Sequence, residues 1–205
     1  MKRGLFITFE GTEGCGKTTQ LVLLAERLGR KVIMIREPGG TLVGEDIRRV
    51  FKGGHEMSAM TELFLLSASR AQLVQDKIVP ALEAGITVLC DRYYDSTLAY
   101  QGYGRGLDRT MIQEINEYAI QGVHPDLTLL LRVPLRLSEV RQKVRGPQDR
   151  IEKSGSSFFQ RVEEGFEDIL LGNPDRVKVL DGTKPVDVLG EEIWTLVSAA
   201  LTKKR

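Results

Sequence analysis

The chain has 205 residues, of which 28% are charged and 41% are hydrophobic, and its formal net charge is +1. These values are ordinary for a soluble globular protein, and the length suffices for one domain with a substantial core. A net charge this close to zero excludes a global field that would recruit nucleic acid or an anionic membrane, so neither is expected as a partner.

Short apolar segments alternate with amphipathic segments along the chain. The apolar segments predict β-strands at 4–9, 31–35, 86–90, 127–133 and 176–180. The amphipathic segments predict helices at about 17–28, 44–51, 60–84, 110–121, 135–144, 157–171 and 186–201. This alternation favours an α/β fold with a five-stranded parallel sheet and helices on both faces, in a single domain over 1–205. Because ligands bind at the carboxyl ends of such strands, the loops after the first four strands should face one cleft.

The loop after the first strand reads Gly-Thr-Glu-Gly-Cys-Gly-Lys-Thr and fits G-x-x-x-x-G-K-[ST] at every fixed position. Its glycines allow backbone N–H groups to point at phosphate oxygens, and the following helix directs its positive end at the same anion. Lys17 would lie against the β- and γ-phosphates, and Thr18 could bind Mg²⁺. The predicted nucleotide-binding residues are Gly11, Thr12, Glu13, Gly14, Cys15, Gly16, Lys17 and Thr18.

The third predicted strand is followed by Asp91 and Arg92. A carboxylate at the end of a buried strand is typical of a Walker-B acid, so we expect Asp91 to bind Mg²⁺, partly through water, beside Thr18. The alternative for Asp91 is a cap on the next helix. Arg92 would reach the same cleft, and an acid next to an arginine suits a site for both metal and phosphate.

Further arginines are predicted at the same edge of the sheet. Arg36 begins the loop Arg-Glu-Pro-Gly-Gly-Thr after the second strand, and Arg48 lies in the helix that follows. Arg70 lies on an apolar helix face, so it needs an anionic or polar partner. Each arginine alone is more often a surface charge, but their joint placement favours a second phosphate or a base.

The polar segment 145–157 lies between two predicted helices and contains glycine and proline. This composition predicts a mobile loop, and arginines on a lid that closes over a transferring phosphate can neutralise its charge. Arg145 and Arg150 are the candidates, and a solvated charged loop is the alternative.

Cysteine usage and hydropathy indicate where the chain functions. Cys15 and Cys90 lie far apart and have no metal-ligand spacing, as expected for reduced thiols. No apolar run reaches roughly 18 residues, and 1–9 has no signal-peptide pattern. We therefore expect a cytoplasmic protein.

Several family-specific motifs follow one another along nearly the whole chain. Besides the glycine-rich loop they are Phe9–Gly11, Arg36–Thr41, Ser69–Gln72, Asp91–Tyr93, Asp95–Gly102 and Asp149–Glu152. With these motifs the chain resembles bacterial thymidylate kinase, a family of P-loop nucleoside monophosphate kinases. The resemblance implies a P-loop NTPase fold with a lid. It also implies Mg²⁺-dependent transfer of the γ-phosphate of ATP to dTMP, giving dTDP and ADP for dTTP synthesis, in a homodimer.

The resemblance also implies roles for individual residues. Arg48 and Arg92 match residues that grip the phosphate of the monophosphate, and Arg70 and Gln101 match those that hydrogen-bond thymine. The implied dTMP-binding residues are Arg36, Arg48, Leu66, Arg70, Arg92, Ser96, Thr97, Tyr100 and Gln101. The implied catalytic residues are Lys17, Arg92, Glu13 (near the acceptor phosphate and sugar) and Arg150, which supplies transition-state charge from the lid.

One departure from the family pattern keeps alternatives open. Leu66 stands where the family usually has a phenylalanine that stacks on thymine, and Phe64 could replace that ring only if the helix were rotated. A related P-loop kinase with a different monophosphate acceptor is therefore an alternative. A nucleotide-binding switch is another, although the sequence lacks the guanine-specific Asn-Lys-x-Asp, and a catalytically silent binding module is a third.

Overall fold

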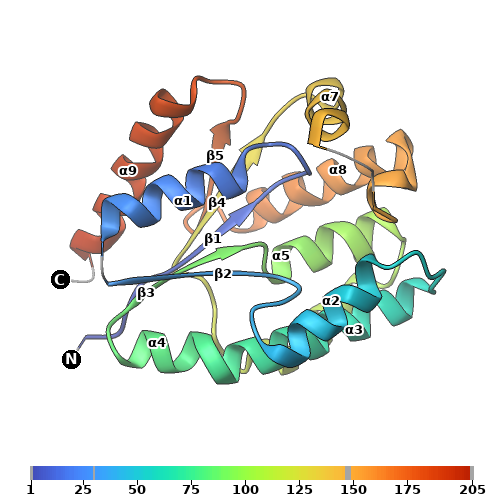
Figure 1. Cartoon of the computed structure of the whole chain (residues 1–205), viewed down its shortest axis with the longest axis horizontal. Coiled ribbons are helices and arrows are strands. Elements are labelled where there is room, and N and C mark those ends of the chain that lie inside the picture. Colours follow the sequence, from blue (N-terminus) through green and yellow to red (C-terminus); the bar gives the residue numbers. More distant parts are fainter. Residues whose placement is uncertain (1, 30, 146–148, 204–205) are drawn as a thin grey trace.

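A parallel sheet of five strands forms the centre of the structure (Figure 1). The computed structural model describes residues 2–29, 31–145 and 149–203. The strands are β1 (Phe6–Glu10), β2 (Val32–Arg36), β3 (Thr87–Asp91), β4 (Leu127–Arg132) and β5 (Val177–Asp181). Every neighbouring pair is parallel and the order across the sheet is β2-β3-β1-β4-β5. The predicted α/β fold and its five-stranded sheet are thus confirmed.

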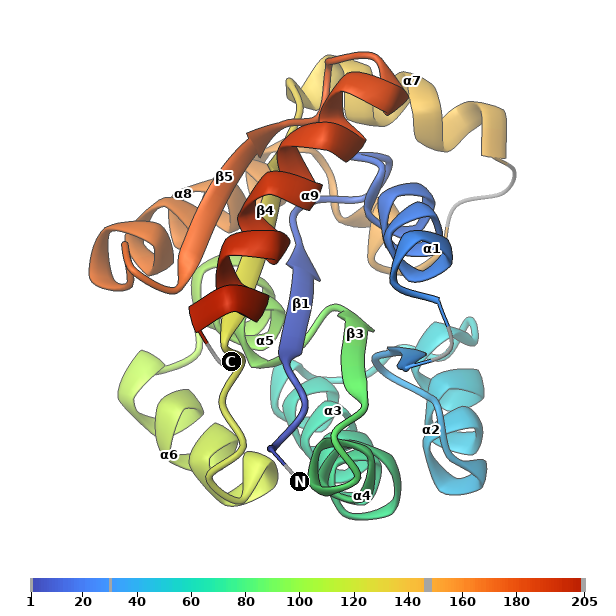
Figure 2. The same ribbon diagram turned by 90° about the vertical axis from the view of Figure 1, so that its left-hand side faces the viewer.

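Helices cover both faces of the sheet (Figures 1 and 2). On one face lie α1 (Lys17–Leu28) and α9 (Val186–Lys203). On the other lie α3 (Ala59–Leu73), α4 (Val79–Glu83), α6 (Arg109–Ile120) and α8 (Ser156–Gly172). The other α-helices in the described residues are α2 (Leu42–Lys52), α5 (Tyr94–Thr97) and α7 (Leu135–Arg145). Of these, α2 packs on α3. In the described part of the chain, none of the helices is long and apolar enough to cross a membrane.

Successive side chains of the central strands point to opposite faces of the sheet, so each strand contributes to the apolar core on both faces. In β1, Ile7 and Phe9 pack toward α1 and α9, whereas Phe6 packs toward α3 and α4. In β4, Leu129 packs with the first group and Leu130 packs toward α8. Strands buried on both faces read as continuous apolar runs, which is why they are easy to predict.

The predicted helix at 60–84 contains a π-helical turn, η1 (Val74–Ile78), between α3 and α4. Pro80 follows at the start of α4 and has no N–H to donate to the preceding turn, so the hydrogen-bond ladder changes there.

The sequence predicted no helix over 94–104, where the structure has α5 and the π-helical η2 (Leu98–Gly104). Glycine lowers the helix propensity of this segment, but close packing on α8 stabilises it. A Cβ at Gly104 would lie 2.5 Å from a ring atom of Phe158. The segment thereby brings its polar side chains to the ends of β1 and β3.

Candidate active site

A cleft of about 1020 Å³ lies at the carboxyl ends of the strands. It extends from the glycine-rich loop and the start of α1, past the ends of β2 and β3, to α3 and η2. The predicted site residues that line it are Glu13, Gly14, Cys15, Gly16, Lys17, Thr18, Arg36, Arg48, Leu66, Arg70, Asp91, Arg92, Ser96, Thr97, Tyr100 and Gln101. Three of the predicted nucleotide-binding and catalytic residues lie outside this lining: Gly11, Thr12 and Arg150.

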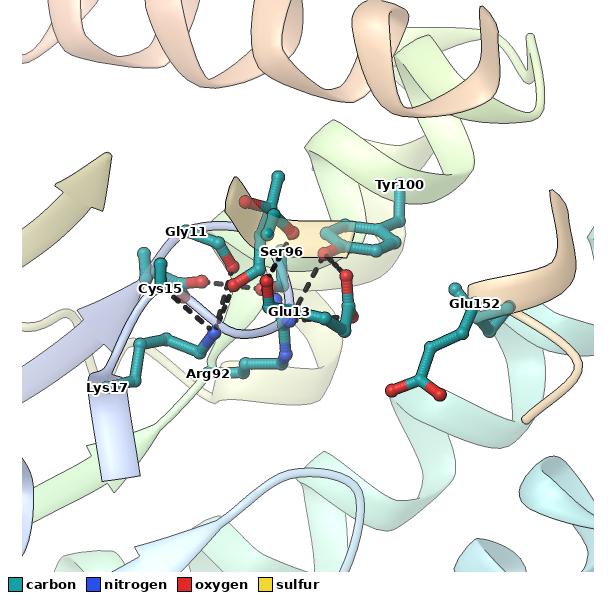
Figure 3. A network of polar contacts seen from close by, with 12 residues as sticks. Gly11, Glu13, Cys15, Lys17, Arg92, Ser96, Tyr100 and Glu152 are labelled. Atoms are coloured by element: carbon teal, nitrogen blue, oxygen red, sulfur yellow. Dashed lines mark hydrogen bonds and ion pairs between the residues drawn. The ribbon is translucent and has the colours of Figure 1, made fainter. Parts of the chain in front are cut away.

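The glycine-rich loop curls around the ammonium group of Lys17. Lys17 Nζ donates to the carbonyl oxygens of Gly11 at 3.1 Å and Thr12 at 2.8 Å, and it lies 3.5 Å from the Sγ of Cys15 (Figure 3). Gly11 has a φ of 129°, and a Cβ there would lie 2.2 Å from the carbonyl oxygen of Leu131. Only glycine fits this approach to β4. The loop is therefore preformed, with a buried cation at its centre.

Thr18 and Asp91 meet across the gap between α1 and β3. The Oγ1 of Thr18 donates to the Oδ2 of Asp91 at 2.7 Å. Two side-chain oxygens at the mouth of a phosphate-binding loop are the ligand type that Mg²⁺ prefers. The described residues contain no cluster of three or more His, Cys, Asp or Glu that could bind a metal ion. Such an arrangement suits an ion that takes its other ligands from nucleotide phosphates and water.

Arg92 lies at the centre of a polar network between the glycine-rich loop and η2 (Figure 3). Its guanidinium donates to Glu13 Oε1 at 2.7 Å, to Ser96 Oγ at 3.0 Å and to Tyr100 Oη at 3.1 Å. The hydroxyl of Tyr100 donates to the other Glu13 oxygen at 2.8 Å. Arg92 has a φ of 71°, a left-handed conformation that is uncommon outside glycine and is typical of functional sites.

Behind this network lies Glu10, whose carboxyl is fully buried. It accepts hydrogen bonds from the Tyr93 N–H at 2.7 Å and the Ser96 hydroxyl at 2.5 Å. Burial and the nearby Asp95 carboxylate raise its pKa to about 8, although Arg92 opposes the shift. Glu10 therefore changes its protonation state in a range where an unperturbed glutamate would be ionised.

We expect the stability of the chain to fall between about pH 4.5 and pH 8 because of Glu10. Its pKa is higher in the folded chain than in the unfolded one, so the stability it contributes is fully present below pH 4.5 and is lost as the pH rises to about 8, above which the profile levels off. From pH 6 to pH 8 the loss should be on the order of 2 kcal/mol. Urea unfolding at several pH values measures it, and Glu10→Gln should flatten this profile. An equally steep profile in the variant would show that another group causes the dependence.

Arg70 is buried at the far end of the cleft, where it is 1% exposed. Its guanidinium pairs with Glu37 at 2.7 Å and donates to Asn116 and Thr97, each at 2.8 Å. Burial alone would lower the pKa of Arg70, but the Glu37 carboxylate outweighs it and raises the pKa. Glu37 is thus the anionic partner that the sequence predicted for Arg70. Nη1 makes one hydrogen bond among the described residues, to Asn116, so its second N–H can serve a ligand.

The neighbouring wall of the cleft combines an amide with apolar side chains. Gln101 is 1% exposed, its Nε2 donates to Glu62 at 2.9 Å, and its Oε1 is buried with no hydrogen-bond partner among the described residues. Leu66 lines the cleft and packs in one cluster with Phe51. Phe64 is 56% exposed and lies outside the lining, so it does not replace the stacking ring.

Arg48 and Arg36 face the cleft from α2 and the end of β2. Arg48 Nη1 donates to the carbonyl oxygen of Pro38 at 2.8 Å. Burial lowers the pKa of Arg48, and the charge of Arg36 lowers it further. Arg36 in turn forms an exposed ion pair with Glu45 at 3.0 Å. An anion bound near both arginines would relieve their repulsion.

The lid segment is only partly described, because 146–148 lie outside the described residues, as does the side chain of Arg145. Asp149 and Glu152 line the cleft. Arg150 instead pairs with Glu62, and its Cζ lies over the ring of Phe51, 5.3 Å from the ring centroid. The structure therefore places Arg150 beside the far end of the cleft rather than against the glycine-rich loop.

Another guanidinium lies at the loop, one that the sequence did not single out. Arg141 of α7 donates to the carbonyl oxygens of Gly14 at 3.1 Å and Gly182 at 3.2 Å. On the same face of α7, the Ser138 hydroxyl donates to the Glu13 carbonyl at 2.6 Å. The signal was available, since α7 follows a central strand and these two polar residues are spaced i, i+3.

Comparison with known proteins decides the family. A family model described as thymidylate kinase matches residues 9–193. The chain belongs to the thymidylate kinase family. A thymidylate kinase from Deinococcus radiodurans is 48% identical over 97% of this chain and 98% of its own length. A thymidylate kinase from Thermomicrobium roseum is 43% identical over 98% of this chain and 97% of its own length. The crystal structure of thymidylate kinase from Ehrlichia chaffeensis has a TM-score of 0.78 at 34% identity, covering 95% of this chain and 99% of that one.

The sequence-based assignment to the thymidylate kinase family and to the P-loop NTPase fold is therefore confirmed. The chain is a kinase of this family, and the alternative of another acceptor is not favoured. The roles of the individual residues stay predictions, which the geometry of the cleft now makes specific.

Proposed function

We propose that the chain transfers the γ-phosphate of ATP to the 5′-phosphate of dTMP, giving dTDP and ADP. One observation supports this most strongly: a single cleft joins a preformed triphosphate loop to a buried pocket with hydrogen-bonding groups for a base. Arg92 lies between the two, bonded to the loop residue Glu13 and to Ser96 and Tyr100 on the pocket side. Donor and acceptor phosphates would meet at this arginine.

The chain contributes positioning and charge. Lys17 would exchange the loop carbonyls for the β- and γ-phosphate oxygens of ATP, since a charged acceptor binds an ammonium more strongly than a carbonyl does. Arg92 would stabilise charge on the phosphates, and Glu13 fixes its guanidinium. Arg48 and Arg36 would bind the dTMP phosphate from the opposite wall. Little covalent chemistry is needed from the protein in phosphoryl transfer.

The base would occupy the pocket between Arg70, Gln101 and Leu66. A remaining Arg70 N–H can donate to a thymine carbonyl, and the unpartnered Gln101 Oε1 can accept from the ring N3–H. Leu66 would cover the ring by apolar contact. Ser96, Thr97 and Tyr100 complete the lining.

Mg²⁺ fits beside Thr18 and Asp91, whose oxygens already lie 2.7 Å apart. When bound with ATP, the ion neutralises phosphate charge. Thr18 would bind it directly, and Asp91 would orient its water ligands.

Thr18→Val should raise the Mg²⁺ concentration that gives half-maximal activity by about tenfold, because one oxygen ligand is lost. The rate at saturating Mg²⁺ should change less. Thr195→Val makes the same replacement at an exposed residue of α9 outside the cleft lining and should leave the Mg²⁺ requirement unchanged. If both variants need the same Mg²⁺ concentration as the wild type, Thr18 does not bind the ion.

Other features of the proposal rest on the sequence. Arg150 can act as a transition-state cation only if it leaves Glu62 when the lid at 145–157 closes. A single kinase domain over 1–205, a homodimer, a cytoplasmic location and the absence of nucleic-acid partners are likewise proposed.

An ADP-release assay with ATP, Mg²⁺ and each of dTMP, dUMP, dCMP, AMP and GMP tests the acceptor. We expect release to be fastest with dTMP. Faster release with another monophosphate would keep the phosphoryl-transfer site but refute the thymine pocket. ATP binding without any acceptor-dependent release would leave a binding module.

A further inference from the structure

A buried carboxylate, Glu62 of α3, lies behind the base pocket and outside the cleft lining. Its side chain is 1% exposed. Gln101 Nε2 donates to Glu62 Oε2 at 2.9 Å, and Arg105 Nε donates to the same oxygen at 3.2 Å. Arg105 Nη2 lies 3.1 Å from the other oxygen, which also pairs with Arg150. Donors from η2, from the residue after it and from the lid segment thus converge on one carboxylate.

The contact with Glu62 determines how the Gln101 amide is turned: its Nε2 points at Glu62, and its Oε1 does not. An ionised carboxylate only accepts hydrogen bonds, whereas an amide has one accepting and one donating end. Glu62, paired with two arginines, therefore selects the –NH₂ end of Gln101. The opposite end, Oε1, is buried without a hydrogen-bond partner in the described residues. A buried acceptor of this kind is costly unless a ligand supplies the donor.

We propose that Glu62 is a positioning residue that sets the preference of the base pocket for a ring with an N–H donor. The inference rests on the proposed function and deepens it. Thymine carries a hydrogen on N3, whereas N3 of cytosine is an acceptor. With its orientation fixed by Glu62, Gln101 Oε1 pairs with thymine and meets the lone pair of cytosine. Glu62 does not touch the base, so its effect passes through Gln101.

Glu62→Gln tests this role, because a glutamine both donates and accepts and so permits either orientation of the Gln101 amide. The measurement is kcat/KM for dTMP and for dCMP. We expect the ratio of the two to fall about tenfold, as for one mismatched buried hydrogen bond. Weakened pairing with Arg105 and Arg150 would affect both nucleotides alike, so the ratio isolates the amide orientation.

The exchange variant Glu62→Gln/Gln101→Glu provides the rescue. Both oxygens of the carboxylate at position 101 accept hydrogen bonds, so an acceptor faces the base whichever way the group turns, while the amide at position 62 can donate to it. We expect the dTMP to dCMP ratio to return to within about threefold of the wild type. Glu83→Gln, an exposed residue of α4, is the matched control and should leave the ratio unchanged.

The outcomes separate the inference from the proposed function. A wild-type chain that phosphorylates neither nucleotide refutes the function itself. A wild type that prefers dTMP, together with an unchanged ratio in Glu62→Gln, overturns only the positioning role. If a thermal melt shows that Glu62→Gln does not fold, Glu62→Asp decides instead, because it keeps the charge but withdraws the carboxylate from Gln101: a fall in the ratio supports the role, and an unchanged ratio refutes it.

Discussion

Lys17→Ala is expected to lower kcat with ATP and dTMP by about 10³-fold, because it removes a preorganised charge at the transferring phosphates. In the structure the ammonium is buried among the loop carbonyls of Gly11 and Thr12. A bound triphosphate replaces these weak acceptors with charged oxygens, so the interaction strengthens as charge develops. Steady-state ADP release and single-turnover kinetics measure the loss.

The control for this variant is Lys77→Ala, an exposed lysine in η1 on the other side of the sheet from α1. It should retain wild-type activity. Both variants should melt within a few degrees of the wild type, since each removes few stabilising contacts. Activity within about threefold of the wild type in Lys17→Ala would contradict the assigned role.

Arg70→Met should destabilise the fold by about 3–5 kcal/mol, because it leaves the buried carboxylate of Glu37 without its counter-ion. The side chains of the pair are 2% and 4% exposed, so water cannot replace the lost partner. For a chain of this length the melting temperature should fall by roughly 10 °C or more. The affinity for dTMP should fall as well. Urea unfolding and dTMP titration measure the two effects.

Two comparisons test the cause of this destabilisation. Arg70→Met/Glu37→Gln removes the stranded charge and should recover part of the lost stability. Arg49→Met disrupts an exposed ion pair, in which Arg49 is 79% exposed, and should cost less than about 1 kcal/mol. Equal losses from the buried and the exposed arginine would contradict the account of Arg70.

Local patterns predicted the triphosphate end of the site. The glycine-rich loop requires its residue types at fixed spacing, and its placement between a buried strand and a helix follows from periodicity. The sequence predicted Asp91 beside Thr18, because the glycine-rich loop and the end of the third strand lie at the same edge of the sheet, but it did not predict their direct hydrogen bond. Such features need no knowledge of distant side chains.

The base end depends on contacts between distant segments, and here the sequence was less informative. It predicted that Arg70 needs a polar partner, but not that Glu37, from the loop after β2, supplies it. It missed the helical segment 94–104, where tertiary packing overrides weak propensity. The sequence could have indicated Glu62. It lies four residues before Leu66, on the same buried face of α3, and a buried acid needs hydrogen-bond or charge partners.

Phosphoryl transfer to dTMP can be followed directly by ³¹P NMR of ATP and dTMP in the presence of the chain and Mg²⁺. We expect the β-phosphate signal of dTDP to grow in step with ADP, with little inorganic phosphate. Release of inorganic phosphate with dTMP unchanged would show hydrolysis rather than transfer and would contradict the proposed function.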